Sequence, residues 1–151
     1  ETGNTLVLFN YIEKHGTPLY DLINNNIDDA RKVFFVHGGT EVEDREEVRK
    51  ITETESNAVI VASYGTFSTG INIKRLHNII FASPSKSRIR NLQSIGRVLR
   101  KGEGKDMAIL YDIADDIGGQ NYTLKHLNER VNIYNDENFR YEVIKVNLRA
   151  N

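Results

Sequence analysis

Five short apolar runs, rich in β-branched and aromatic residues, recur along the chain and most constrain its fold. Runs of this length and composition predict strands buried on both faces of a sheet. They occupy residues 6–9, 33–36, 58–62, 78–81 and 108–111. Polar segments long enough for helices separate them at residues 19–26, 42–54 and 87–99. Because strands and helices alternate, the sequence predicts right-handed β-α-β units and an α/β fold, with a parallel sheet covered by helices on both faces.

The chain beyond residue 115 changes character after a cluster of aspartates and glycines. Apolar residues at three- and four-residue intervals predict a helix over residues 124–134, whose apolar face we assign to packing. Alternation over residues 141–148 predicts a strand. The expected organisation is a linker or cloning remnant at residues 1–4, a main lobe at 5–118, and a helix-strand extension at 119–151 packed on that lobe.

Composition restricts the class of protein. A chain of 151 residues with 39% hydrophobic content suits one soluble globular domain. No apolar run approaches the roughly 20 residues that span a bilayer, and no signal-peptide pattern opens the chain, so we expect a cytoplasmic protein without a membrane partner. Cysteine is absent and the four histidines lack ligand spacing, so we expect neither disulfides nor a metal site.

Charge is distributed unevenly although the formal net charge is only −1. Residues 57–102 contain no acidic residue and eight basic ones, whereas residues 41–55 contain seven acidic residues against three basic ones. A fold that gathers the acid-free region on one side would present a positive field to phosphates.

Within the acid-free region, the segment QSIGRVLR at residues 93–100 predicts a phosphate-sensing helix face. In helical projection, Gln93, Gly96, Arg97 and Arg100 share about one third of the circumference. Arginine can form paired hydrogen bonds with phosphate oxygens. A solvated basic face on an amphipathic helix is the alternative. The surrounding sequence favours the phosphate-binding interpretation. Ligands of parallel sheets gather at the carboxyl ends of strands, and we expect residues 63–75 to form a loop at such an end, where residues 93–100 can be its neighbours.

These motifs resemble those of the second RecA-like lobe of superfamily 2 helicases, over residues 5 to about 115. Gln93, Gly96, Arg97 and Arg100 match the QxxGRxxR pattern of motif VI. The SYGTFSTGINI segment looks like motif V, LVLFN at residues 6–10 is similar to motif IV, and a strand ending in His37 and Gly38 fits the family's order of elements. Through VASYG, FSTG, IGRVLRK and the C-terminal tail, the likeness extends to phage UvsW-type recombination helicases.

The resemblance implies roles for nine residues. Arg100, with Arg97 beside it, would act as the arginine finger, and Gln93 would contact the γ-phosphate or its attacking water. The implied nucleotide-binding residues are Gly70, Asn72 and Gly96; the implied nucleic-acid-binding residues are Ser63, His37 and Asn10. Simpler interpretations remain for most of them: DNA phosphate binding for the arginines, solvation for Gln93, a simple turn for the loop that holds Ser63 and Gly70, a cap or turn for Asn72, and a structural role for His37. Asn72 stands where many relatives have aspartate, and Thr69 where a charged residue is common.

The resemblance also implies ATP and Mg²⁺, both bound mainly by an N-terminal RecA-like lobe of the same polypeptide, since this chain has no G-x-x-x-x-G-K-[ST] sequence. Branched or single-stranded DNA is the implied substrate, and the chain alone should hydrolyse ATP poorly. The alternative is a noncatalytic nucleic-acid-binding or protein-docking module on the same fold. A dinucleotide-dependent oxidoreductase fits less well, because residues 10–14 lack its glycine fingerprint.

Overall fold

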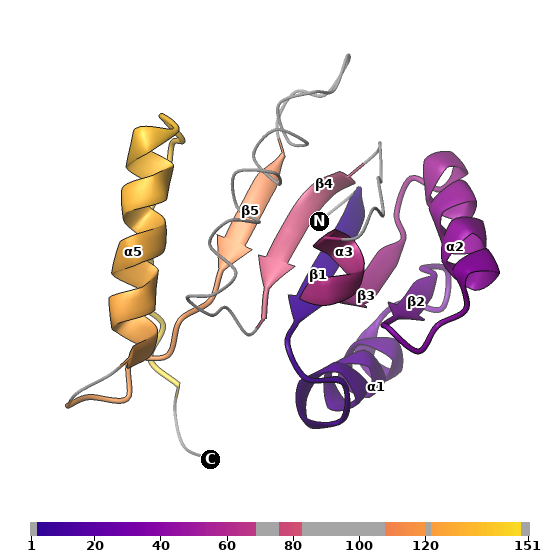
Figure 1. The fold of residues 1–151 in the computed structure, drawn as a ribbon, viewed down its shortest axis with the longest axis horizontal. Coiled ribbons are helices and arrows are strands. Elements are labelled where there is room, and N and C mark those ends of the chain that lie inside the picture. The colour runs from indigo at the N-terminus through magenta and orange to yellow at the C-terminus, as the bar shows by residue number, and fades with distance from the viewer. Residues whose placement is uncertain (1–2, 69–75, 83–107, 120–121, 149–151) are drawn as a thin grey trace.

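The computed structural model describes residues 3–68, 76–82, 108–119 and 122–148. The elements in chain order are β1 (Asn4–Phe9), η1 (Ile12–Gly16), α1 (Thr17–Asn26), β2 (Val33–Val36), α2 (Val42–Thr54), β3 (Val59–Ser63), α3 (Tyr64–Ser68), β4 (Leu76–Phe81), β5 (Ile109–Asp112) and α5 (Tyr122–Asp136). Figure 1 shows the strands side by side, with α2 and α5 at opposite ends of the molecule.

The five strands form one sheet in the order β2-β3-β1-β4-β5, and every neighbouring pair is parallel. The central strand β1 aligns Phe9 with Ser63 of β3 and Leu8 with Phe81 of β4. All carboxyl ends therefore meet at one edge, as the matching arrowheads of β1, β4 and β5 show (Figure 1). The predicted parallel α/β sheet is confirmed.

Alternating residues of each strand build two cores on opposite faces of the sheet. On one face, Leu6 and Leu8 of β1, Ile60 of β3 and Tyr134 of α5 belong to one buried cluster, and Val48 of α2 packs against this cluster. On the other face, Val7, Phe9, Val59 and Val61 form a cluster that Leu19, Tyr20 and Ile23 of α1 cover. Because alternating positions of the strands are apolar on both faces of the sheet, helices cover both faces, as predicted.

Some predicted and observed elements differ by more than small shifts of their bounds. β1 begins at Asn4, a fully buried residue of the predicted linker. The short helices η1 and α3 were not predicted. The strand expected over residues 141–148 is not formed: these residues follow α5 without pairing in the described sheet, and Val143, Ile144, Val146 and Leu148 are exposed. Alternation marks a segment that can pair, but a strand also needs a neighbour. The helix expected over residues 87–99 lies outside the described residues.

Candidate nucleic-acid interface

The carboxyl edge of the sheet brings together the three residues predicted to bind nucleic acid. His37 follows β2, Ser63 ends β3 and Asn10 follows β1, and these three strands are neighbours in the sheet. The register places Val36 opposite Ala62, and Ser63 opposite Phe9, so the three side chains start from nearly the same level. Because adjacent strands lie about 4.8 Å apart, the three positions span about 10 Å across the sheet.

The loop after β2 fixes the orientation of His37. The Gly39 N–H donates to His37 Nδ1 at 3.0 Å, and the ring packs against Phe35 with centroids 5.1 Å apart. The loop closes through hydrogen bonds from His37 N to Thr40 Oγ1 (3.0 Å) and from Thr40 N to His37 O (2.9 Å). Since Nδ1 accepts a hydrogen bond, the neutral ring carries its proton on Nε2, which can donate to a phosphate oxygen.

Ser63 also has a local structural role that the sequence did not predict. Its Oγ lies 2.7 Å from Thr66 Oγ1 and accepts from the Thr66 N–H at 3.3 Å, at the start of α3. The side chain is 9% exposed. Ser63 therefore caps the short helix α3. Either hydroxyl of this pair can be the donor. When Thr66 Oγ1 donates to Ser63 Oγ, the hydroxyl hydrogen of Ser63 can point to another acceptor.

The six residues predicted to meet the nucleotide lie outside the described residues. They are Arg97, Arg100, Gln93, Gly96, Gly70 and Asn72. Their roles remain predictions from the sequence motifs. The strands β4 and β5 follow the two segments that contain these six residues. Both strands have their carboxyl ends at the same edge of the sheet as His37 and Ser63.

A buried ion pair at the end of β5 escaped the sequence analysis. Arg130 of α5 donates from Nε to Asp112 Oδ2 at 2.7 Å and from Nη2 to Asp112 Oδ1 at 2.8 Å, and the Tyr134 hydroxyl donates to Asp112 Oδ2 at 2.6 Å. The Arg130 side chain is 2% exposed, and that of Asp112 is 10% exposed. In the described part of the chain, Arg130 Nη1 has no hydrogen-bond partner. The cluster joins α5 to the carboxyl end of the last strand.

One sequence signal was available for this cluster. Arg130 and Tyr134 are four residues apart, so they share a helix face with the apolar positions of the predicted helix. An arginine on the apolar face of a helix predicts a buried acidic partner. Which carboxylate serves as partner could not be chosen, because Asp112 is 18 residues away and depends on how α5 packs.

The hydroxyl of Tyr134 makes stability sensitive to alkaline pH. Burial raises the pKa of Tyr134 above its ordinary value of about 10, the Asp112 carboxylate raises it further, and Arg130 partly opposes these effects. Above about pH 10 the unfolded chain loses this proton while the folded chain keeps it. The folded state then binds more protons, so its free energy of unfolding should fall by about 1.4 kcal/mol per pH unit.

We expect Tyr134→Phe to remove this slope, because phenylalanine has no proton to lose. Urea unfolding between pH 9 and about 11.5 measures it. The matched control is Tyr122→Phe, on a side chain that is 70% exposed at the start of α5, which should keep the wild-type slope. Equal slopes for wild type and Tyr134→Phe would contradict the prediction.

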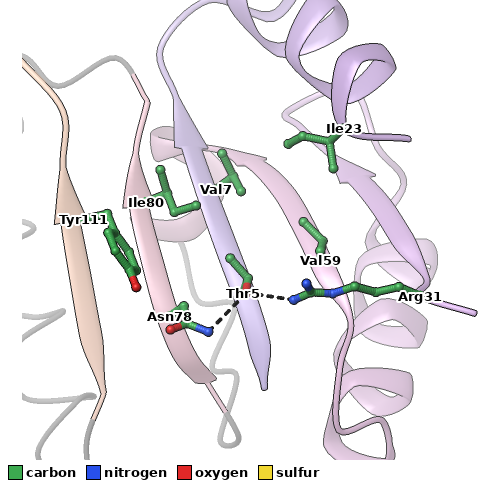
Figure 2. A pocket seen from close by; sticks show the side chains of 8 residues that line it. All are labelled: Thr5, Val7, Ile23, Arg31, Val59, Asn78, Ile80 and Tyr111. Atoms are coloured by element: carbon green, nitrogen blue, oxygen red, sulfur yellow. Dashed lines mark hydrogen bonds between the residues drawn. The ribbon is translucent and has the colours of Figure 1, made fainter. Parts of the chain in front are cut away.

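A hollow of about 270 Å³ on the face of the sheet lies away from this edge (Figure 2). Its floor includes Thr5, Val59 and Asn78, which stand near the amino ends of their strands. Arg31 Nη2 donates to Thr5 Oγ1 at 3.1 Å, and Asn78 Nδ2 donates to the same oxygen at 3.4 Å. The polar side chains of the hollow thus form hydrogen bonds with one another. The hollow also lies near the amino ends of the strands, whereas ligands of parallel sheets bind at the carboxyl ends.

Within residues 3–68, 76–82, 108–119 and 122–148, no group of three or more histidine, aspartate or glutamate side chains is arranged to hold a metal ion. Within the same ranges, no helix combines the length and the apolar character needed to cross a membrane.

The five-stranded parallel sheet with helices on both faces has the architecture expected of a RecA-like lobe. Residues 1–102 match the family model described as the helicase conserved C-terminal domain, and the chain belongs to this family. The predicted resemblance to superfamily 2 helicases is thereby confirmed.

Individual relatives agree with this family assignment. The chain is 40% identical over 158 aligned residues to the "ATP-dependent DNA helicase uvsW" of Enterobacteria phage T4. The aligned region covers 96% of this chain and 31% of that protein. The crystal structure of T4 UvsW matches with a TM-score of 0.70 and 39% identity, over 91% of this chain and 30% of that one. The C-terminal part of the Fun30 ATPase domain matches with a TM-score of 0.56 and 18% identity, over 93% and 50%, and shows the fold alone. The chain thus spans about a third of the length of its phage relative.

Proposed function

We propose that this chain is the second motor lobe of an ATP-dependent DNA helicase that acts on branched DNA such as forks and recombination junctions, and on RNA–DNA hybrids. The observation that carries the proposal is the 40% identity to a phage protein named an ATP-dependent DNA helicase, which extends over 96% of this chain. Because the chain spans 31% of that relative, the activity would belong to the complete polypeptide.

In this proposal, the lobe completes an ATP site that opens toward its carboxyl edge. Arg100 and Arg97 stabilise the charge that develops on the γ-phosphoryl group, and Gln93 orients the γ-phosphate or the attacking water. Gly70, Asn72 and Gly96 lie close to the nucleotide. The motif spacing in the sequence supports these roles, as does the meeting of all described strand ends at one edge.

The same edge would bind the DNA backbone. His37 offers an Nε2–H donor held in place by the Gly39 amide, and Ser63 and Asn10 stand on the next two strands. Ser63 lies within the acid-free region over residues 57–102, whose eight basic residues would supply positive charge to the phosphates.

ATP and Mg²⁺ would be bound mainly by an N-terminal RecA-like lobe of the same polypeptide. This chain has no phosphate-binding glycine loop of the G-x-x-x-x-G-K-[ST] kind. Closure of one lobe on the other would bring the arginines to the nucleotide and move the bound strand.

The test compares the complete polypeptide with the 151-residue chain. We expect the complete polypeptide to hydrolyse ATP when DNA is added and to unwind forks, four-way junctions and RNA–DNA hybrids faster than linear duplexes. The chain alone should hydrolyse ATP at least about 10³-fold more slowly, because its arginines have no nucleotide to act on. DNA binding without DNA-stimulated hydrolysis by the complete polypeptide would instead identify a noncatalytic binding module.

A further inference from the structure

The turn that follows β1 has an unusual hydrogen-bond pattern. In η1, the carbonyl of Tyr11 accepts from the N–H of His15 at 2.9 Å and from the N–H of Gly16 at 3.0 Å. The second bond spans five residues and makes this turn a π-helix. Turns of this kind are rare in proteins, but those that occur are often found at functional sites. The turn stands at the carboxyl end of the central strand, directly after Asn10.

Packing against the core holds this turn in place. A Cβ added to Gly16 would lie 2.5 Å from the ring of Phe9, so only glycine allows the turn to approach that ring so closely. Phe9 is fully buried and cannot move aside without disturbing its cluster. The base from which Tyr11 projects is therefore rigid.

Tyr11 itself presents an aromatic surface to solvent at this rigid position. Its side chain is 64% exposed, and its ring meets that of His15 edge-on, with centroids 5.4 Å apart and an interplanar angle of 65°. An edge-on contact occupies the edge of one ring and leaves a face of the tyrosine accessible. The exposed charges of Glu13 and Lys14 on the same turn cancel, so the turn offers aromatic surface rather than net charge.

We infer that Tyr11 stacks on a nucleobase of single-stranded DNA held at the carboxyl edge of the sheet; this inference rests on the proposed function. The neighbouring residues His37, Ser63 and Asn10 offer hydrogen-bonding groups suited to the sugar-phosphate backbone. A base can reach an aromatic ring only when it is unstacked from a duplex, so the contact selects the single strand. Tyrosine stacking accepts every base and adds affinity without sequence preference.

The test measures binding of the complete polypeptide to a fluorescent single-stranded oligonucleotide. We expect Tyr11→Ala to weaken binding about tenfold and Tyr11→Phe to preserve it, since phenylalanine keeps the stacking surface. The dependence of affinity on salt should be the same in all three proteins, because no charge is removed. Tyr122→Ala, at a tyrosine that is 70% exposed on α5, is the matched control and should bind like wild type.

An abasic oligonucleotide separates stacking from other effects. Wild type should bind an abasic strand about tenfold less tightly than a normal one, whereas Tyr11→Ala should lose much less on the same change. Ultraviolet cross-linking to a 5-iododeoxyuridine strand should label the peptide that contains Tyr11. Equal affinities of wild type and Tyr11→Ala, or equal losses of both on the abasic strand, would overturn the inference.

Failure of the inference can be told from failure of the proposed function in the same preparations. If Tyr11→Ala binds like wild type while DNA-stimulated ATP hydrolysis is normal in wild type and lost in Arg100→Ala, only the stacking role is wrong. If the wild-type polypeptide shows no DNA-stimulated hydrolysis, the proposed function is wrong. If Tyr11→Ala reduces hydrolysis but not binding or cross-linking, Tyr11 contacts the other lobe and the inference is again overturned.

Discussion

Replacing Arg100 with alanine in the complete polypeptide is expected to lower kcat for DNA-stimulated ATP hydrolysis by about 10³-fold and to leave DNA affinity nearly unchanged. The reason is that a guanidinium which meets the γ-phosphoryl group stabilises charge that develops only in the transition state. Such an interaction contributes to kcat and little to the binding of either substrate. Steady-state hydrolysis at saturating DNA, together with a DNA titration, measures both quantities.

Two other arginines sharpen this test. Arg97→Ala should also reduce kcat, and the larger loss of the two identifies the main finger. Arg88 belongs to the same acid-free region but lies about half a turn from Arg97 in helical projection, so Arg88→Ala is the matched control and should keep kcat. If Arg97→Ala and Arg100→Ala instead weaken DNA binding and make it less dependent on salt while kcat is kept, the arginines bind DNA phosphates.

Replacing Asp112 with alanine is expected to lower the free energy of unfolding of this chain by about 3–5 kcal/mol at neutral pH. The change leaves the Arg130 guanidinium, which is 2% exposed, without the carboxylate that accepts two of its hydrogen bonds. It also removes the acceptor of the Tyr134 hydroxyl. A buried charge without a partner is costly because water cannot replace the lost contacts. Urea unfolding of the variant and the wild type measures the difference.

A double substitution and a surface pair serve as controls. Asp112→Leu combined with Arg130→Leu removes both charges together and should cost much less than Asp112→Ala alone. Glu46→Ala breaks the pair with Arg49 on the surface of α2, where water screens the charges, and should change stability little. If Asp112→Ala were no more destabilising than Glu46→Ala, the cluster would not secure α5 to the sheet.

Local sequence patterns determined most of the elements of this protein. The helix predicted over residues 42–54 matches α2, Val42–Thr54, because a polar segment of this length between two buried strands indicates a helix. The five strands predicted from the apolar runs all begin within two residues of their expected starts, because each is a short apolar run bounded by polar residues. Motif spacing likewise identified the helicase family, since residues 93–100 hold the pattern in eight consecutive positions.

The tertiary structure alone decided what depends on contacts between distant residues. The sheet order places β1 at the centre, between β3 and β4, and so brings His37, Ser63 and Asn10 to one edge. Packing of α5 chose Asp112 as the partner of Arg130, and the absence of a pairing neighbour in the described sheet left residues 141–148 outside it despite their alternation. Apolar periodicity shows that a residue will be buried or a segment can pair, whereas the identity of the partner follows from the free energy of the whole packed arrangement.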